Sequence, residues 1–173
     1  EGQASMLYEK KEAVFYNKVQ VLNRDTSIQT IRLFAEQRIK ELNDKMSKNH
    51  PNHPKVEGIR ILDALAATGL RSIRYLKEIP GVSHVTINDL LPEATAQALE
   101  NCKRNNVDEE RVTINTGDAI MYMYNHRDHL EQYDVIDLDP YGSASPFIDS
   151  AVQAVADGGL LCVTCTDMPV LSG

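Results

Sequence analysis

The stretch 135–143 carries the residues best suited to chemistry. It places an acid, a proline, an aromatic ring and a glycine in succession, at Asp139, Pro140, Tyr141 and Gly142. The apolar run before them is typical of an interior parallel strand, which Pro140 ends because it has no N–H to donate. A carboxylate and a flat ring thus stand together at the carboxyl end of a strand, the edge where open α/β sheets bind ligands. We expect Asp139 and Tyr141, with Pro140 in the same substrate-binding turn, to hold a planar substrate that bears an amine.

A D-P-x-G turn alone is common where a strand stops, but if S-adenosylmethionine binds at this edge, methylation of an exocyclic amine is the chemistry that suits this pair. Such an amine on a nucleobase is a poor nucleophile, because its lone pair is delocalised into the ring. A carboxylate that accepts a hydrogen bond from the amine favours a pyramidal nitrogen, and positioning and electrostatics then carry most of the displacement. Stacking on Tyr141 is worth about 1–3 kcal/mol and would partly offset the cost of taking the base out of its helix.

Acids also end three earlier strand-like runs, at Asp63, Asp89 and Asp118. Asp89 lies 20 residues after Gly69, the spacing of an acid that grips a ribose diol, although a helix cap is the plain alternative. Asp118 either caps a helix or accepts from an adenine amine while the N–H of Ala119 donates to the ring. The three acids together suit a nucleoside-type cofactor.

The turn that follows Asp63 is built of small residues, so a ligand can approach its backbone. It contains a single glycine, Gly69, and therefore lacks the G-x-G-x-x-G pattern of a dinucleotide site. A nicotinamide cofactor is disfavoured for that reason, whereas S-adenosylmethionine would deliver its methyl group near Asp139. Arg71, just beyond the turn, is either a partner for the cofactor's carboxylate or a solvated helix residue.

Regular alternation of strands and helices must position these groups. We expect strands at 59–65, 85–89, 112–115, 133–139 and 160–166, and helices at 70–78, 92–106, 119–131 and 146–156. This pattern predicts an α/β fold with a doubly wound, mostly parallel sheet and right-handed crossovers. Ser145 is the expected cap of the last helix and the pair Gly158-Gly159 its expected end.

Residues 1–57 are expected to form an N-terminal arm and helix, and residues 58–173 the core of a single domain. The segment 1–24 has no strong periodicity and predicts a surface arm or short hairpin. Apolar residues at three- and four-residue spacing predict a helix over about 27–46. Because few residues follow the last strand, we expect further strands or another domain in the intact protein to cover the sheet edge.

The composition of the chain limits the classes of partner that it can bind. A net charge of −7 argues against a surface that clamps nucleic acid all round, although a local basic rim remains compatible with it. No apolar run approaches the ~20 residues of a membrane span. Cys162 and Cys165 form a lone C-x-x-C without a second ligand pair, so we interpret them as buried strand cysteines and expect no metal.

The longer motifs resemble the tRNA guanine-26 N2-dimethyltransferase family. The matching segments are FYN-x-VQ-x-x-NRD at 15–25, ATGLRSIRY at 67–75, ND at 88–89, VIDLDPYGS at 135–143 and VTCTDM at 163–168. They cover nearly the whole chain, which looks like the family's N-terminal catalytic domain without its C-terminal tRNA-binding domain. The resemblance implies a class I, Rossmann-like methyltransferase fold that uses S-adenosylmethionine to mono- and then dimethylate a guanine amine in tRNA.

The resemblance also implies roles for single residues. Those that look like cofactor contacts are Arg24, Arg71, Asp89, Asp118 and Ala119. Asp139 looks like the catalytic acceptor, and Tyr141 stands where members carry Tyr or Phe. The arm with Phe15, Tyr16 and Asn17 looks like a lid that contacts the substrate. The chain departs from the family at Lys18 and Ala144, where proline is usual or frequent, and at Asp63, where Glu is frequent.

Two alternatives remain open. An adenine- or glutamine-amine methyltransferase uses a similar D/N-P-P-Y turn, but here Tyr141 directly follows Pro140. A non-catalytic relative that binds RNA or a partner is disfavoured by the acids at all four strand ends. We expect an intracellular protein, with a nuclear, mitochondrial or cytoplasmic place left open, and we leave its oligomeric state open, a monomer included.

Overall fold

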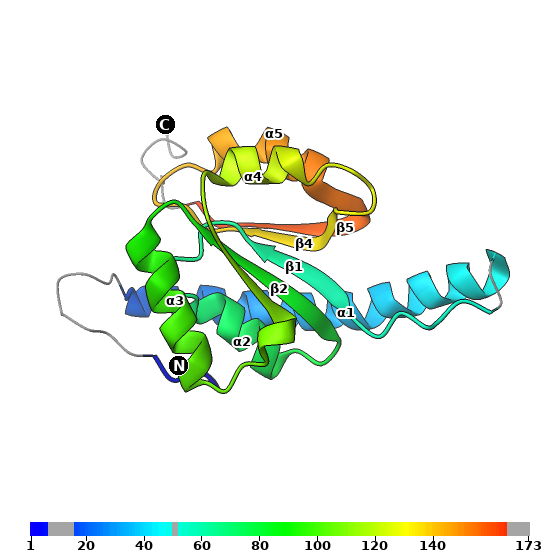
Figure 1. Ribbon diagram of the computed structural model, residues 1–173, viewed down its shortest axis with the longest axis horizontal. Coiled ribbons are helices and arrows are strands. Elements are labelled where there is room, and N and C mark those ends of the chain that lie inside the picture. Colours follow the sequence, from blue (N-terminus) through cyan, green and yellow to red (C-terminus); the bar gives the residue numbers. More distant parts are fainter. Residues whose placement is uncertain (7–15, 50–51, 166–173) are drawn as a thin grey trace.

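One parallel sheet forms the centre of the computed structural model, which describes residues 1–6, 16–49 and 52–165 (Figure 1). Its strands are β1 (Ile59–Asp63), β2 (Val82–Asp89), β3 (Val112–Thr116), β4 (Tyr133–Leu138) and β5 (Val155–Val163). They lie in the order β3-β2-β1-β4-β5, and every neighbouring pair is parallel. The predicted α/β fold with a doubly wound parallel sheet is confirmed.

Helices cover both faces of the sheet. On one side lie α1 (Val21–Asn49), α2 (Leu70–Glu78) and α3 (Pro92–Arg104), and on the other α4 (Ala119–Asn125) and α5 (Ser145–Ala154) (Figure 1). Short 3-10 turns precede α1 and β3, at Lys18–Gln20 and Glu109–Arg111. Successive residues of β1 serve opposite cores, because Ile61 packs on the α1–α3 side and Leu62 on the α4–α5 side.

The strand order reverses between β1 and β4. The chain runs from β1 outward to β2 and β3, then returns to the other side of β1 to form β4 and β5. Ligands of doubly wound sheets bind outside the carboxyl ends of the strands at such a switch point. The register places Asp63 of β1 directly beside Asp137 of β4, so two acids stand next to each other at this edge.

The start of α1 corrects the expected arm. The helix begins at Val21 rather than near Ser27 and continues to Asn49, so Arg24 lies in its first turns and not in an extended segment. Leu22 is 76% exposed and therefore outside any apolar stripe, while Arg24 is buried through polar contacts. Polar partners in distant segments, which periodicity does not reveal, hold this end of the helix.

Element ends elsewhere also differ from the predictions. The bounds of α2 match, but α4 ends at Asn125, and α5 ends at Ala154. Gly158 and Gly159 lie within β5, which begins directly after α5 and shows an irregular register against β4. Ala144 occupies the cap position of α5, and Ser143 Oγ, not the side chain of Ser145, accepts from a backbone N–H there.

Two further predictions concern the burial of the cysteines and the presence of a membrane-spanning helix. Cys162 lies in β5 and is half-buried, whereas Cys165 follows the strand and is exposed, so the buried-strand interpretation was wrong for Cys165. Within the ranges that the structure describes, no helix is both long enough and apolar enough to cross a membrane.

Candidate active site

The turn after β1 is held in an unusual backbone conformation. Ala67 has a φ of 48°, and Gly69 has a φ of 76°, where a Cβ would come within 3.2 Å of Ala98 Cβ. Asp89 Oδ2 accepts from Ala67 N at 2.8 Å and pins this turn to the end of β2. Left-handed non-glycine residues cost of order 1–3 kcal/mol and gather at ligand sites, so the conformation suits a ligand turn, while the approach of Gly69 to Ala98 suits tight packing.

Asn88 ties three strand ends together. Its Nδ2 donates to Ala64 O at 2.9 Å and to Gly117 O at 3.2 Å, and its Oδ1 accepts from Asn115 Nδ2 at 2.7 Å. The side chain is fully buried. The sequence analysis noted Asn88 only as half of a motif, although a polar residue just inside an apolar strand was the available signal.

Asp89 and Asp118 both accept from backbone groups of the turns that follow them. Asp89 Oδ1 accepts from Leu91 N at 3.0 Å, and Asp118 Oδ1 caps α4 through Met121 N at 2.9 Å. The helix-cap alternative therefore describes the contact that Asp118 makes. Each carboxylate oxygen has two lone pairs, so both acids can still accept from a nucleoside at this edge.

Arg71 is buried, which excludes the alternative of a solvated helix residue. Its Nε donates to Asp137 Oδ2 at 2.8 Å and its Nη2 lies 3.4 Å from Asp137 Oδ1. The hydroxyl of Tyr75, one turn further along α2, donates to the same Asp137 Oδ2. Asp139 Oδ2 lies 3.6 Å from Arg71 Nε. Arg71 Nη1 is buried and has no hydrogen-bond partner.

Asp63 has a buried acceptor without a partner, whereas Arg71 has a buried donor without one. Ser72 Oγ donates to Asp63 Oδ2 at 2.6 Å, whereas the buried Oδ1 has no partner. Complete burial, followed by the negative charge of Asp137, raises the pKa of Asp63 to about 7. One cationic donor, on Arg71, and one acidic acceptor, on Asp63, are thus left unmet at the switch point. These are the partners that the carboxylate and the ammonium of an amino-acid group require.

The end of β4 presents the acid and the ring as predicted. The Asp139 side chain is 23% exposed, and burial raises its pKa while the charge of Arg71 opposes that rise. Tyr141 is 78% exposed; burial of its hydroxyl, then the charges of Asp139 and Asp89, raise its pKa. The ring therefore lies near both acids and still offers surface to a ligand. Pro140 between them is buried.

Arg24 and Asn17 make contacts within the N-terminal segment. Arg24 donates to both carboxylate oxygens of Glu1, at 2.7 and 2.6 Å, and to Asn17 O at 3.1 Å. The hydrogen bond from Arg24 is the largest cause that lowers the pKa of Glu1 to about 2. Burial raises the pKa of Asp139, and the charge of Arg24 is the smallest of the influences that oppose this rise. Asn17 Oδ1 caps the first 3-10 turn, and Phe15 lies outside the described residues.

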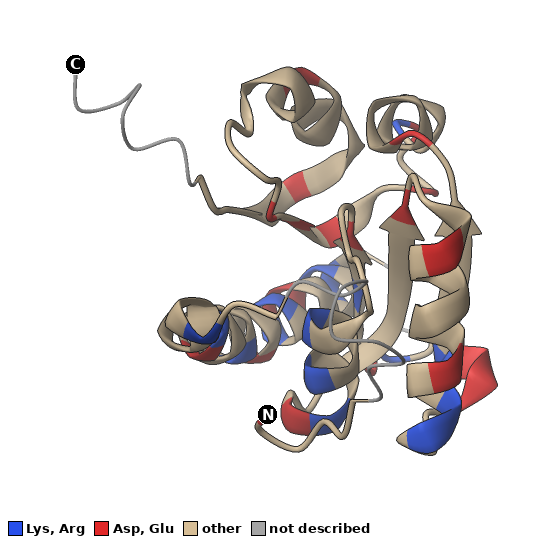
Figure 2. Cartoon of the chain, turned by 90° about the vertical axis from the view of Figure 1, so that its left-hand side faces the viewer, with Lys and Arg blue, Asp and Glu red and all other residues tan. Residues whose placement is uncertain are grey.

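Asn23 and Thr164 connect α1 to the site, and the sequence analysis assigned neither. Asn23 Nδ2 lies 3.3 Å from Thr164 Oγ1, which in turn lies 3.4 Å from Arg71 Nη2. Both residues fall in motif segments, so the motifs were the signal that marked them. Lys and Arg lie mainly on helices beside the sheet, whereas acidic residues lie both on the strands with their tips and on helices (Figure 2).

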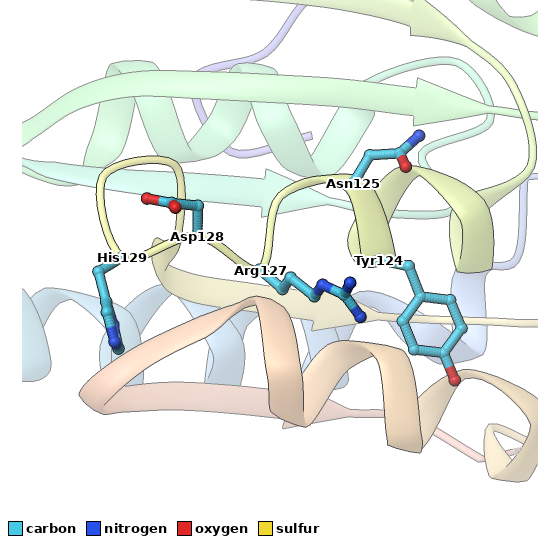
Figure 3. Close-up of a pocket in the computed structure, with 5 residues that line it drawn as sticks. All are labelled: Tyr124, Asn125, Arg127, Asp128 and His129. Carbon is cyan, nitrogen blue, oxygen red and sulfur yellow. The ribbon is translucent and has the colours of Figure 1, made fainter.

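A separate open hollow lies away from this edge. It is lined by Tyr124, Asn125, Arg127, Asp128 and His129 in the connection from α4 to β4 (Figure 3). Because α4 starts beside the carboxyl end of β3 and β4 starts at the amino edge, this connection lies at the opposite edge. Asn125 and His129 point in different directions, so the lining does not converge on a ligand (Figure 3). In the described part of the chain, no three His, Cys, Asp or Glu side chains could share a metal ion.

Comparison with sequence families gives a match over residues 1–173 to the model for N2,N2-dimethylguanosine tRNA methyltransferase. The tRNA (guanine(26)-N(2))-dimethyltransferases of Schizosaccharomyces pombe and Caenorhabditis elegans are 41% and 45% identical to the chain. Both alignments cover all of this chain but only 37% and 34% of those proteins. The chain thus spans about a third of the length of the curated relatives it matches.

Solved structures agree on the fold. Trm1 from Pyrococcus horikoshii, in complex with S-adenosyl-L-methionine, is 30% identical, with a TM-score of 0.76 over 96% of this chain and 42% of that one. The tRNA m1G37 methyltransferase of M. jannaschii, 17% identical, has a TM-score of 0.57 over 86% of this chain and 36% of its own. This second likeness concerns the fold alone.

Proposed function

Because this chain belongs to the N2,N2-dimethylguanosine tRNA methyltransferase family, we propose that it forms the catalytic part of an enzyme that methylates the exocyclic amine of guanine 26 in tRNA. The cofactor would be S-adenosylmethionine and the products N2-methyl- and N2,N2-dimethylguanosine. The structural observation that carries the proposal is the switch-point edge, where Asp139 stands beside one unmet donor on Arg71 and one unmet acceptor on Asp63. The names of the relatives supply the substrate.

The residues present fit the cofactor at both of its ends. Arg71 Nη1 and Asp63 Oδ1 match the carboxylate and ammonium of its amino-acid part in charge and in hydrogen-bonding sense. Asp89, at the end of β2, would hold the ribose, and Asp118 with the N–H of Ala119 would hold the adenine. Arg24 would act from α1 by its charge, since its donors are engaged with Glu1 and Asn17.

Asp139 would orient the amine. When bound, the cofactor would supply a methyl group on a sulfonium: its S–C bond would break as the N–C bond forms, which leaves the thioether S-adenosylhomocysteine, and the methylated amine would lose one proton to water. A carboxylate oxygen of Asp139 accepts a hydrogen bond from the amine and holds its lone pair in line with the methyl carbon. Tyr141 stacks on the base, and burial of Asp139 strengthens its hydrogen bond because the local dielectric is low.

The tRNA would be held in part by surfaces other than this edge. Phosphate contacts require clustered Lys and Arg, whereas the strand ends carry acids and the chain has a net charge of −7. We propose that the intact protein meets the target guanine here and the phosphate backbone elsewhere, as an intracellular tRNA enzyme. By resemblance to the family, Asn17 and Phe15, the latter outside the described residues, would contact the substrate.

Nucleoside analysis tests the proposal. The intact protein is incubated with S-adenosylmethionine and a tRNA that has guanosine at position 26, and the RNA is digested and analysed by mass spectrometry. N2-methylguanosine should appear first and N2,N2-dimethylguanosine later, and a tRNA with adenosine at position 26 should remain unmodified. Methyl groups on adenosine, or on a glutamine of a protein substrate, would support the other amine-directed class. Binding of S-adenosylmethionine without any turnover would support the non-catalytic alternative.

A further inference from the structure

Asp137 is the one acid of this edge without a proposed contact to cofactor or substrate. It lies on β4, whereas Asp139 directly follows that strand, and both side chains approach Arg71 of α2. Its side chain is fully buried and receives three hydrogen bonds, from Arg71 Nε, Arg71 Nη2 and Tyr75 Oη. A buried carboxylate is costly unless it is paired and hydrogen-bonded, as Asp137 is here.

The hydrogen bonds of Arg71 are divided unequally among its nitrogens. Asp137 takes the edge formed by Nε and Nη2, and Nη2 is also within 3.4 Å of Ser27 Oγ and Thr164 Oγ1. Nη1 alone has no partner, although Arg71 is 7% exposed. A guanidinium is a planar fork, so fixing one edge also fixes the direction of the remaining nitrogen.

We infer that Asp137 is a positioning residue, which holds the Arg71 guanidinium so that Nη1 is directed at the cofactor's carboxylate and Arg71 is kept from pairing fully with Asp139. The inference rests on the proposed function. Without the Asp137 charge, the nearest acid to Arg71 Nε is Asp139, at 3.6 Å. The guanidinium would turn toward it, and both the cofactor contact and the catalytic acceptor would change together.

The pH dependence of methylation reports that change. Charged and titratable groups reach Asp139 or its partner Asp137 from every neighbouring element: Arg71 and Tyr75 from α2, Asp63 from β1, Arg24 from α1, Cys162 from β5 and Tyr141 from the adjoining turn. The negative charge of Asp137 raises the pKa of Asp139 and the charge of Arg71 lowers it. Removing Asp137 and bringing Arg71 closer both lower that pKa, so the acidic limb of the rate profile should move to lower pH.

The test compares two isosteric variants on the same strand, in the intact protein. Asp137→Asn keeps the shape and removes the charge. Asp134→Asn is the matched control, because Asp134 also pairs with an arginine, Arg38 at 3.0 Å, but lies at the amino end of β4. Calorimetry with S-adenosylhomocysteine measures cofactor-site affinity without turnover, thermal melting measures stability, and methylation rates are taken from pH 5 to 9.

The expected results differ between the variants. Asp137→Asn should bind S-adenosylhomocysteine at least tenfold more weakly and shift the acidic limb to lower pH. Asp134→Asn should lower the melting temperature. It should leave the affinity for S-adenosylhomocysteine and the acidic limb of the pH–rate profile unchanged. Wild-type affinity and an unmoved limb in Asp137→Asn would overturn the positioning role, as would equal losses in Asp134→Asn. Failure of the wild type to bind the ligand would instead count against the proposed function.

A milder variant covers the case in which Asp137→Asn does not fold. Tyr75→Phe removes one donor to Asp137 and leaves both charges in place. Its affinity for S-adenosylhomocysteine should fall about threefold, because the carboxylate is less firmly oriented. Unchanged affinity in a folded Tyr75→Phe protein would overturn the inference on its own.

Discussion

Two aspartates of β4 each pair with an arginine, and the two pairs differ in how fully their hydrogen-bonding groups are satisfied. At the amino end, Asp134 accepts from Arg38 Nε and from Arg60 N, both at 3.0 Å, and Arg38 also donates to Asp157 O. At the carboxyl end, the pair of Asp137 and Arg71 leaves Arg71 Nη1 buried and unpaired. We call the Asp134–Arg38 pair closed, because other groups of the protein complete its hydrogen bonds. We call the Asp137–Arg71 pair open, because one buried donor has no partner.

On the proposed function, the difference marks where the fold gives up stability for cofactor binding. A buried polar atom without a partner costs about 1–3 kcal/mol. Arg71 Nη1 and Asp63 Oδ1 are both in this state at the carboxyl edge. A ligand that supplies the missing partners recovers that cost, so the open pair favours binding, whereas the closed pair contributes only to the stability of the fold.

The largest contrast should come from removing one acid at each edge. Asp139→Ala should slow methyl transfer by about 10²–10⁴-fold, because the amine loses its acceptor. Its affinity for S-adenosylhomocysteine should stay within about threefold, since other residues hold the cofactor. Asp134→Ala should retain near-normal turnover. Single-turnover rates with saturating tRNA measure both, and comparable losses in the two variants would remove the functional distinction between the edges.

Removing the arginine of each pair should lower the free energy of unfolding by different amounts at the two edges. Arg71→Ala leaves Asp137 buried without its counter-charge, which costs about 3–5 kcal/mol of the free energy of unfolding. Arg38→Ala should cost about 1 kcal/mol, because Asp134 keeps a backbone donor and is nearer to solvent. Urea denaturation gives both values. A larger loss in Arg38→Ala would show that the amino-edge pair is the more important of the two.

Asp63 should make stability depend on pH in a direction opposite to that of most carboxyl groups. Its pKa is about 7 in the folded state against 3.8 for an ordinary Asp, so the folded protein binds the extra proton between these values. Its contribution to the free energy of unfolding therefore falls as pH rises from about 4 to 7, by at most about 1.4 kcal/mol per pH unit.

The matched comparison is with Asp63→Asn, which carries no titratable group at that position. Chemical denaturation at intervals from pH 4 to 7.5 gives the free energy of unfolding of both proteins. As pH rises, the free energy of unfolding of the wild type should fall relative to that of the variant. A constant difference would mean that Asp63 titrates in its ordinary range. Saturating S-adenosylhomocysteine should reduce the slope, because the bound ammonium stabilises the ionised carboxylate.

The smallest expected contrast is between two tyrosines. Tyr141→Ala should raise the KM for tRNA about tenfold, because one base–aromatic stack is lost, whereas Tyr141→Phe should be close to wild type. Tyr124, which lines the hollow of Figure 3 and whose hydroxyl contacts Asp149 of α5, is the control outside that turn. Tyr124→Ala should leave the KM unchanged, and an equal rise there would place part of the RNA contact on that side.

The sequence predicted the sheet, the alternation of elements and the edge that carries the acids. Periodicity and strand-end chemistry are local signals, so the bounds of α2 and the positions of Asp89 and Asp139 could be derived from them. The start of α1 could not, because Glu1 and Thr164 hold it from distant parts of the chain.

The role of Arg71 and the end of α5 show the same limit. Whether Arg71 is buried depends on Asp137, which is 66 residues away in the chain. Gly158-Gly159 resembles a helix end by composition, yet it lies in a strand because β5 pairs with β4 directly after α5. Contacts between distant segments decide such cases, and a single sequence does not display them.

Hydrogen–deuterium exchange of the intact protein, with and without saturating S-adenosylhomocysteine, tests most directly that the carboxyl edge is the cofactor site. The account predicts slower exchange in the turns at 64–69, 89–91, 117–119 and 139–142, and no change at 124–132, the connection that forms the hollow. Protection at 124–132 with none in the four turns would contradict it.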